Sequence, residues 1–403
     1  MKKNISKTTK MQKQNPARKQ RVQAVKQRAQ ARKQRAQARK KGETAQAGRK
    51  QPESWGKQRV TIGLDLGDRK SKYCVFDGVS YLKEADVPTS PEEMKVVFGA
   101  MQRCRIALEV GTHSPWVSAV LKELGYEVHV ANAREVRAIS KSKKKNDKLD
   151  ARKLARLAHA DPQLLSPIKH RSMQAQMDLL RIRARAGLVE ARTGLVNMVR
   201  GLVKAQGQRI RKCDTDSMSA ELLRGLDESL IAALKPAMKV IETLTEQIQQ
   251  YDKQVAELAE KYPETQRLRQ VAGVGPLIAT AYVLTLEDAQ RFSKSRHVGG
   301  YLGLTPTQKD SGDSHPQLRI TKAGDCYLRT LLVQGAHYIL GAHGPDSDLR
   351  RWGQKLAGGG SDRQKQRAVV AVARKLAVLL HRLWKTGETY EPLHNSEPSR
   401  QAA

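Results

Sequence analysis

The chain has 403 residues, which is enough for two or three domains. It carries 74 Lys and Arg residues against 40 Asp and Glu residues, and its formal net charge is +34. Half of this charge lies in residues 1–50, where 18 basic residues stand beside a single acid, Glu43. The rest of the chain is also strongly basic, so a solubilising tail alone does not account for the charge. A nucleic acid is the partner that this composition favours.

We expect no membrane-spanning segment, because the most apolar stretch, around Ala368–Leu380, is short and is interrupted by Arg374 and Lys375. No secretory segment follows the basic start. The cysteines lie far apart and form no C-x-x-C pair, which argues against a zinc ribbon or a disulfide framework; they are Cys74, Cys104, Cys213 and Cys326. We therefore expect a reduced protein of the cytoplasm that associates with the nucleoid and not with a membrane.

Residues 1–57 form a basic, low-complexity segment. The heptapeptide KQRAQAR occurs at 26–32 and again at 33–39, and the segment has almost no apolar residue to bury. Its residue types are compatible with a helix. We expect this tail to be disordered in isolation and to become helical on an RNA or DNA backbone.

Residues 58–165 alternate between patterns typical of buried strands and patterns typical of helices. The expected strands are 60–67, 72–77, 81–87, 104–110 and 126–130. The expected helices begin at Pro91, near Pro115, at Asn132 and near Asp147. The resulting order, βββαβαβα, is that of the ribonuclease-H-like α/β fold, a mixed sheet with helices on its faces.

Residues 166–262 lack strand patterns and contain two heptad seams. One seam is Ile241, Leu244, Ile248, Tyr251, Val255 and Leu258, and the other is Leu188, Ala191, Leu195, Met198 and Leu202. The two helices, separated by a loop around Cys213–Ser219, predict an antiparallel coiled-coil arm that makes dimers, or alternatively a helical bundle inside one subunit. Residues 263–387 are expected to form a mostly helical third domain, followed by a loose tail, 388–403.

Carboxylates interrupt or end the apolar strands of the first domain. Asp65 lies in the first strand and Glu109 ends the fourth, while Asp147 and Asp150 share one face of the last helix. In a ribonuclease-H-like sheet the first and fourth strands are neighbours and the last helix crosses them, so these four side chains can converge. Such oxygen ligands suit two Mg²⁺ ions, or Mn²⁺, which activate an attacking oxygen at phosphorus.

Three of these acids also have an ordinary alternative role. Asp147 can be a helix cap and Asp150 an acid of the first turn, and Glu109 can form a salt bridge at a strand end. Asp68 is expected to cap a turn. The set of four, and not any single member, indicates a metal site.

The third domain holds candidate phosphate contacts. The segment L-R-Q-V-A-G-V-G-P-L-I-A-T-A at 268–281 has the form of a helix-hairpin-helix, or of a simple helical corner. A polar loop at 305–319 contains Ser311 before Gly312, and by composition this serine is only a turn residue, as His315 is a loop histidine. The expected nucleic-acid contacts are Gly273, Gly275, Arg319, Lys322 and Arg329, with Lys143, Lys144 and Lys145 in the basic run before the last helix of the first domain.

Residues 58–386 resemble the DEDD transposases of bacterial insertion sequences, the group that includes the Piv and MooV invertases (insertion-sequence family one-ten, with its eleven-eleven branch). Three blocks carry the resemblance: G-L-D-L-G at 63–67, K-N-D-K-L-D-A-R-K-L-A at 145–155, and Y-L-G-L-T-P…S-G…I-T-K-A-G-D-C-Y-L-R-T-L-L at 301–332. The strand I-A-L-E-V supplies the remaining acid. The basic repeats at the start of the chain depart from this pattern.

The resemblance implies a RuvC-like domain, a coiled-coil linker and a carboxyl-terminal transposase domain. It places the metal set on Asp65, Glu109, Asp147 and Asp150, and a serine nucleophile on Ser311, with Ser314 as the near alternative. It further implies that Mg²⁺ assists the serine in forming a covalent link to DNA, that an RNA encoded by the element guides donor and target DNA, and that the active site is composite in a homo-oligomer, a dimer or a tetramer.

Two other functions remain open at this point. A hydrolytic nuclease of the Holliday-junction-resolving kind needs the carboxylates but no serine. A non-catalytic nucleic-acid-binding protein needs neither the carboxylates nor the serine. The presence of all four carboxylates argues against this alternative.

Overall fold

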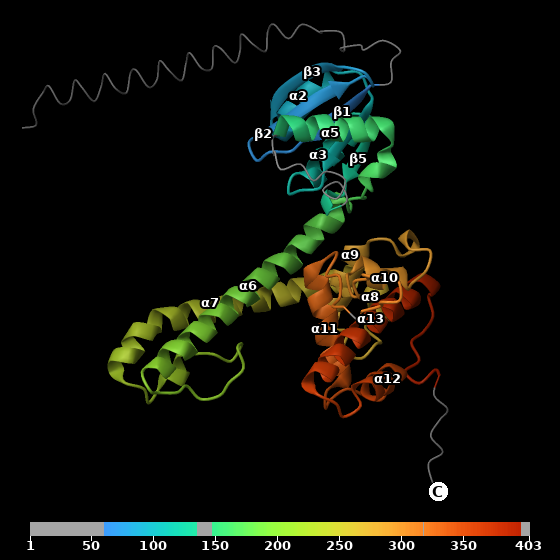
Figure 1. The fold of residues 1–403 in the computed structure, drawn as a ribbon. Helices are drawn as coiled ribbons and strands as arrows, with labels where there is room; N and C mark the ends of the chain where they lie inside the picture. The colour runs from blue at the N-terminus through green and yellow to red at the C-terminus, as the bar shows by residue number, and fades with distance from the viewer. Residues whose placement is uncertain (1–59, 135–146, 317, 396–403) are drawn as a thin grey trace, which may run out of the picture. The chain divides into compact units, whose positions relative to one another are not determined.

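The computed structural model describes residues 60–134, 147–316 and 318–395, and these described residues form two compact units that divide between Lys169 and His170 (Figure 1). The basic repeats at 26–39 and the lysines at 143–145 lie outside the described residues. None of the described helices is both long and apolar enough to cross a membrane.

The first unit is built on one mixed five-stranded sheet with the order β3-β2-β1-β4-β5. The strands are β1 (Thr61–Asp65), β2 (Lys70–Phe76), β3 (Tyr81–Pro88), β4 (Arg105–Glu109) and β5 (Glu127–Ala131). Neighbouring strands are antiparallel from β3 to β1 and parallel from β1 to β5. The mixed α/β sheet predicted from the strand patterns is therefore confirmed.

Helices cover both faces of this sheet. The helices are α2 (Pro91–Gly99), α3 (Ser114–Glu123) and α5 (Asp147–Ala160), followed by the 3₁₀ turn η1 (Pro162–Leu165). Side chains such as Ile62 and Ile106 point from one face into a buried cluster with Phe98 of α2 and Leu121 of α3. Because side chains alternate along a strand, the intervening residues face the other way. Helix α5 packs on that second face, against β1, β2 and β4 (Figure 1).

The second unit is helical throughout its described residues, apart from isolated β-bridges in one loop. Its α-helices are α6 (Met173–Ala205), α7 (Glu228–Lys261), α8 (Glu264–Leu268), α9 (Pro276–Leu286), α10 (His297–Tyr301), α11 (Cys326–Leu340), α12 (Asp348–Ala357) and α13 (Asp362–Thr386). The 3₁₀ turns are η2 (Ala220–Leu223) and η3 (Ala289–Arg291). Helix α9 is apolar on all sides and almost entirely buried, so the other helices pack around it.

Helices α6 and α7 pack against each other along the arm, but one predicted seam is displaced. On α7 the predicted Ile241, Ile248, Val255 and Leu258 are buried. Over residues 188–205 of α6 the buried residues are Arg192, Val196, Val199 and Val203. Of the predicted stripe, Leu195 is partly buried against them, whereas Met198 and Leu202 are 44% and 48% exposed. The shift arises because α6 has two adjacent apolar stripes, and the β-branched one packs against α7.

Candidate active site

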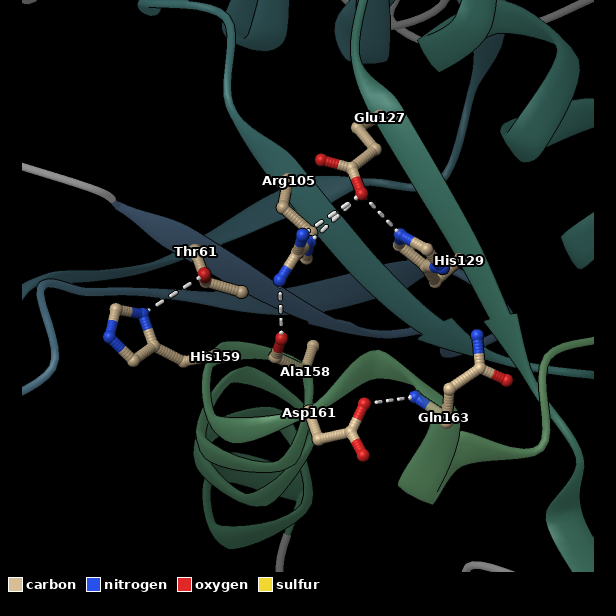
Figure 2. Close-up of polar contacts among 8 residues, drawn as sticks. All are labelled: Thr61, Arg105, Glu127, His129, Ala158, His159, Asp161 and Gln163. Atoms are coloured by element: carbon tan, nitrogen blue, oxygen red, sulfur yellow. Dashed lines mark hydrogen bonds and ion pairs between the residues drawn. The ribbon is translucent and has the colours of Figure 1, made fainter.

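The face of the sheet under α5 carries Asp65. Thr61, Gly63 and Asp65 alternate with buried residues of the opposite face, so the three share one side of β1. Thr61 meets α5 through a contact of 3.2 Å between its Oγ1 and Nδ1 of His159 (Figure 2). At Gly63 the helix passes so closely that an added Cβ would lie 2.0 Å from the carbonyl oxygen of Ala151. Only glycine permits this approach, and Asp65 follows two residues later on the same side.

Glu109 holds the matching position on the neighbouring strand. In the parallel pairing of β1 with β4, Gly63 is opposite Ala107 and Leu64 is opposite Leu108. Ala107 packs under α5 with Leu154, so it faces the same side as Gly63. Two residues beyond this pair, Asp65 and Glu109 therefore end adjacent strands on one face. The register thus leaves the two acids at neighbouring strand ends, and their convergence on a metal ion stays a prediction.

Helix α5 runs antiparallel to both strands. Its last turn lies over the start of the strands, where His159 meets Thr61 and the guanidinium of Arg105 donates to the carbonyl oxygen of Ala158 at 2.9 Å (Figure 2). Its first turns lie over the carboxyl ends, as the contact between Gly63 and Ala151 shows. Asp147 and Asp150, on the first turn of the helix, thus begin α5 at the end of the sheet where β1 and β4 finish.

The structure does not by itself define a metal centre. The side chain of Asp147 lies outside the described residues, as do Lys143, Lys144 and Lys145. Among the side chains that are described, no three His, Cys, Asp or Glu residues form a group that could hold a metal ion. The structure does place the ends of β1 and β4 side by side, and the start of α5, which carries Asp147 and Asp150, lies next to them.

A lysine that the sequence interpretation overlooked lies next to this site. Lys72 of β2 is directly opposite Asp65 of β1, and on its other side it is opposite Asp86 of β3. Its ammonium donates to Oδ1 of Asp86 at 2.8 Å, and this hydrogen bond lowers the pKa of the Asp86 carboxyl. A cation beside a carboxylate edge reduces repulsion among the acids. In the sequence, the only sign of this role is that Lys72 lies between the two buried residues Ser71 and Tyr73 of the strand, and so points to the opposite face of the sheet.

Ser311 and Ser314 face each other in a tight hairpin. The amide of Ser311 donates to the carbonyl oxygen of Ser314 at 3.2 Å, and the amide of Ser314 donates back at 3.0 Å. The turn between them begins at Gly312 with a φ of +54°, a conformation that glycine adopts without strain. Asp310 and His315 form the next pair, with an O–N distance of 3.3 Å. Both serines are exposed, so their hydroxyls are accessible to a large substrate.

Arg329 supports the base of this loop. It is only 9% exposed, and its guanidinium donates to the carbonyl oxygens of Leu302 at 3.0 Å and Ala323 at 2.8 Å. The predicted phosphate contact is therefore replaced by a structural one, since the backbone at both ends of the loop already uses the cation. Arg319 and Lys322 are exposed and stay candidate phosphate contacts.

Gly273 and Gly275 lie in the turn between α8 and α9. Gly273 has a φ of +82°, and an added Cβ would lie 2.8 Å from the carbonyl oxygen of Gly335 in α11. Close helix packing therefore accounts for Gly273. Gly275 caps α9 and has open space around it, so its contact with a phosphate stays a prediction.

Comparison with known families finds two matches in this chain. Residues 62–207 match a transposase family model of the IS110 DEDD type, and residues 265–350 match the transposase family IS116/IS110/IS902. The first match contains the strands, α5 and α6, and the second contains α9 and the Ser311 hairpin. Together the two matches span more than half of the sequence.

Individual curated proteins show the same relationship. A probable family 20 transposase of Pseudomonas aeruginosa is 29% identical over 308 residues, which cover 74% of this chain and 89% of that protein. The transposase for the insertion sequence element IS1111A of Coxiella burnetii is 29% identical over 82% of this chain and 90% of its own length. The transposase for IS1328 of Yersinia enterocolitica is 26% identical over 59% of this chain and 71% of its own length.

Proposed function

Because the chain belongs to the DEDD transposases of the IS110 type, we propose that it cuts and rejoins DNA with a serine nucleophile and a divalent metal ion. The observation that carries the proposal is that Asp65 and Glu109 end adjacent parallel strands, under the helix that begins with Asp147. The proposed metal ligands are Asp65, Glu109, Asp147 and Asp150.

The strand order supports assignment of the first unit to the ribonuclease-H-like fold. Three antiparallel strands followed by two parallel ones, with helices on both faces, is the arrangement inferred from the element order. In this proposal the second unit supplies a helix-hairpin-helix, formed by α8, the glycine turn and α9. In this proposal the first unit supplies the carboxylates that hold the metal ion, and the second unit supplies backbone amides that contact a DNA phosphate.

The ligand chemistry fits Mg²⁺, or Mn²⁺ in its place. Carboxylate oxygens are hard donors, and four of them would balance the charge of two divalent ions. When bound, such ions would polarise the phosphate and activate an attacking hydroxyl. The chain itself sets the spacing of the acids through the parallel register and places the Lys72 ammonium at the neighbouring strand position.

Ser311 is the proposed nucleophile. Its Oγ forms a bond to phosphorus while the bond from phosphorus to the 3′ oxygen breaks, and the serine proton is lost as the 3′ oxygen gains one. The products are a phosphoserine ester with the 5′ end and a free 3′ hydroxyl. Because the ester conserves the bond energy, the reverse attack by another 3′ hydroxyl rejoins DNA strands.

The proposed partners are donor DNA, target DNA and a guide RNA encoded by the element, held by a homo-oligomer. The basic body supports backbone contacts with RNA and DNA, whereas base pairing would supply sequence specificity. Arg319 and Lys322 are the proposed phosphate contacts of the described residues.

Trapping a covalent protein–DNA adduct tests the nucleophile. With Mg²⁺ and a DNA substrate of the element's ends, the unchanged protein should form an adduct that Ser311→Ala abolishes. Ser314→Ala is the matched control across the hairpin, and its adduct should persist. An adduct that persists in Ser311→Ala but is lost in Ser314→Ala moves the nucleophile to Ser314. Cleavage by Ser311→Ala that leaves free 5′ and 3′ ends identifies a hydrolytic nuclease instead.

A second pair of variants tests the carboxylates. Asp65→Asn should lower DNA cleavage by at least about 10³-fold, because it removes a charged ligand from the proposed metal set. Asp68→Asn makes the same chemical change three residues later, where the side chain is 91% exposed and lies 3.6 Å from His113. Cleavage should be nearly unchanged in that control. Equal losses in the two variants would contradict the metal assignment.

A further inference from the structure

A large groove lies in the second unit, beside the loop that carries Ser311. Its volume is about 1870 Å³, larger than the roughly 300–1,000 Å³ of common small-molecule sites. Its lining comes from α12 and α13, from the two arms of the loop that carries Ser311, and from the segment 388–395 that follows α13. The size indicates a polymeric ligand and not a small metabolite.

The floor of the groove is apolar and partly open to solvent. Its apolar lining includes Trp352 and Leu356 of α12, and Val370, Val378 and Leu379 of α13. Leu356 is 41% exposed although it belongs to this patch. A contiguous apolar patch that stays open to water marks a binding surface, because burying it on a ligand is favourable.

The rim of the groove is basic. It is lined by Arg319, Lys322, Arg363, Arg367, Arg374, Lys375 and Arg382, against the acids Asp348, Glu388 and Glu391. Arg382 is already paired with Glu388 at 2.9 Å. Within the described part of the chain, Arg363, Arg367 and Arg374 form no ion pair. The exposed cations of α13 are therefore available to an anionic ligand.

An aromatic ring and a cation also meet inside the groove. The ammonium of Lys375 lies 3.9 Å from the centre of the Trp352 ring. Tyr390 lines the groove as a second aromatic residue. Aromatic faces bind unpaired bases by stacking, while neighbouring cations bind the phosphates that link those bases.

The loop that carries Ser311 lines the groove along one side, so the groove leads toward the proposed nucleophile. A β-bridge joins Pro306 to Ile320, and the amide of Thr307 donates to the carbonyl oxygen of Arg319 at 2.9 Å. These residues form the base of the loop that carries the Ser311 turn. A strand lying in the groove would pass along the loop that presents the proposed nucleophile.

From these observations we infer that the groove binds an unpaired segment of nucleic acid, with bases on the apolar floor and phosphates on the basic rim. The inference rests on the proposed function, since the bound strand would be one that the reaction exposes near Ser311. A duplex hides its base faces and would leave the apolar floor unused. The row from Arg363 to Arg382 spans roughly 28 Å along α13 at about 1.5 Å per residue, enough for several phosphates.

Two charge-reversal pairs in the full-length protein test this site. Arg367→Glu with Arg374→Glu changes the rim on α13, and Lys355→Glu on α12 with Lys365→Glu on α13 makes the same change in charge outside the groove. The probe is a fluorescent thymidine 20-mer, and its affinity is measured by anisotropy at several salt concentrations. The groove pair should lower the affinity about tenfold and lower the salt slope by about 1.4, or about 0.7 per lost phosphate contact. The control pair should change both much less.

The same variants are measured with a 20-base-pair duplex. Equal losses of affinity for the single strand and the duplex would overturn the assignment to unpaired nucleic acid. Equal losses from the groove pair and the control pair would overturn the site itself, because the binding would then follow the overall charge of the surface and not the groove. Thermal unfolding of every variant establishes that the fold is retained.

Trp352→Leu and crosslinking provide an independent test. Leucine keeps the floor apolar but removes the stacking ring, so single-strand affinity should fall on the order of tenfold. Ultraviolet crosslinks from an oligonucleotide that carries 4-thiothymidine should map to peptides of α12 and α13. Crosslinks confined to residues 1–50 would contradict the proposal.

Binding is also measured in Ser311→Ala. This variant should bind the 20-mer as the unchanged protein does, because it keeps the whole groove. Groove-dependent binding without any covalent adduct would refute the serine mechanism alone. An adduct that forms normally in the groove pair, with unchanged affinity, would refute the groove alone.

Discussion

The two proposed catalytic regions are held in place by different means. Asp65 and Glu109 end hydrogen-bonded strands whose register leaves them little freedom, and α5 lies directly on the same face. Ser311 lies in an exposed hairpin turn that depends on isolated β-bridges and on one buried cation at its base. Asp65 and Glu109 are thus placed by the core of a sheet, whereas Ser311 is placed by an exposed loop.

The largest effect is expected from enlarging Gly63. In Gly63→Ala the new Cβ would lie 2.0 Å from the carbonyl oxygen of Ala151 and 2.6 Å from the amide nitrogen of Ala155, so α5 has to shift. We expect a loss of about 3 kcal/mol in the free energy of unfolding. DNA cleavage should fall as well, because the first turn of α5 carries two of the proposed ligands. Thermal unfolding and a cleavage assay measure the two effects.

Gly99→Ala is the control for this change. No atom lies within 4 Å of an added Cβ at Gly99, and the residue ends α2 in a helix where alanine is preferred. Stability should stay the same or rise slightly. If Gly63→Ala were as stable and as active as this control, α5 would not be locked against β1, and the contrast with the loop would fail.

Much of the sheet could be predicted from the sequence because burial imposes a period of two on its strands. Asp65 and Glu109 were expected near each other because the first and fourth strands are neighbours in a ribonuclease-H-like sheet. Gly63 and Lys72 were overlooked, since a glycine or a lysine in a strand gives no sign of its neighbour without the register. The same limit explains the displaced seam on α6, where two apolar stripes of similar spacing compete.

The loop was harder to predict, because the roles of its residues depend on contacts that are remote in sequence. Arg329 looked like a phosphate contact, but Leu302 and Ala323 occupy its guanidinium. The groove beside the loop joins α12, α13 and both loop arms, and no local pattern reveals such a junction. Ser311 itself rests on family resemblance, since composition marks it only as a turn residue.

An intermediate effect is expected from removing the cation under the loop. Arg329→Met leaves the buried carbonyl oxygens of Leu302 and Ala323 without their donor, so the free energy of unfolding should fall by about 2 kcal/mol. Lys309→Met, an exposed change in the same loop, should alter it by less than about 0.5 kcal/mol. Chemical denaturation compares the two. A stable Arg329→Met protein would indicate that the hairpin holds its shape without this support.

The smallest effect is expected from lowering the pH, which acts on a buried histidine in the core of the second unit. His381 is fully buried, its Nε2 hydrogen donates to the carbonyl oxygen of Ala289 at 2.9 Å, and its Nδ1 accepts from the Ser295 hydroxyl at 2.9 Å. Burial lowers its pKa below the ordinary 6.5, with the positive charge of Lys385 acting in the same direction. The neutral ring is therefore favoured in the folded state, and its contribution to stability is present above pH 6.5 and lost as the pH falls below that value.

Melting curves between pH 7.5 and pH 5.5 measure this contribution. The unchanged protein should lose a few degrees of Tm more than His381→Gln, whose amide can keep a hydrogen bond to Ala289 but does not titrate in this range. In the Ser311 hairpin the histidine, His315, is exposed and not buried like His381. Adduct formation by Ser311 should therefore not follow the same pH curve as unfolding. A shared curve would mean that the Ser311 loop and the core around His381 respond to pH as one cooperative element, which would contradict this expectation.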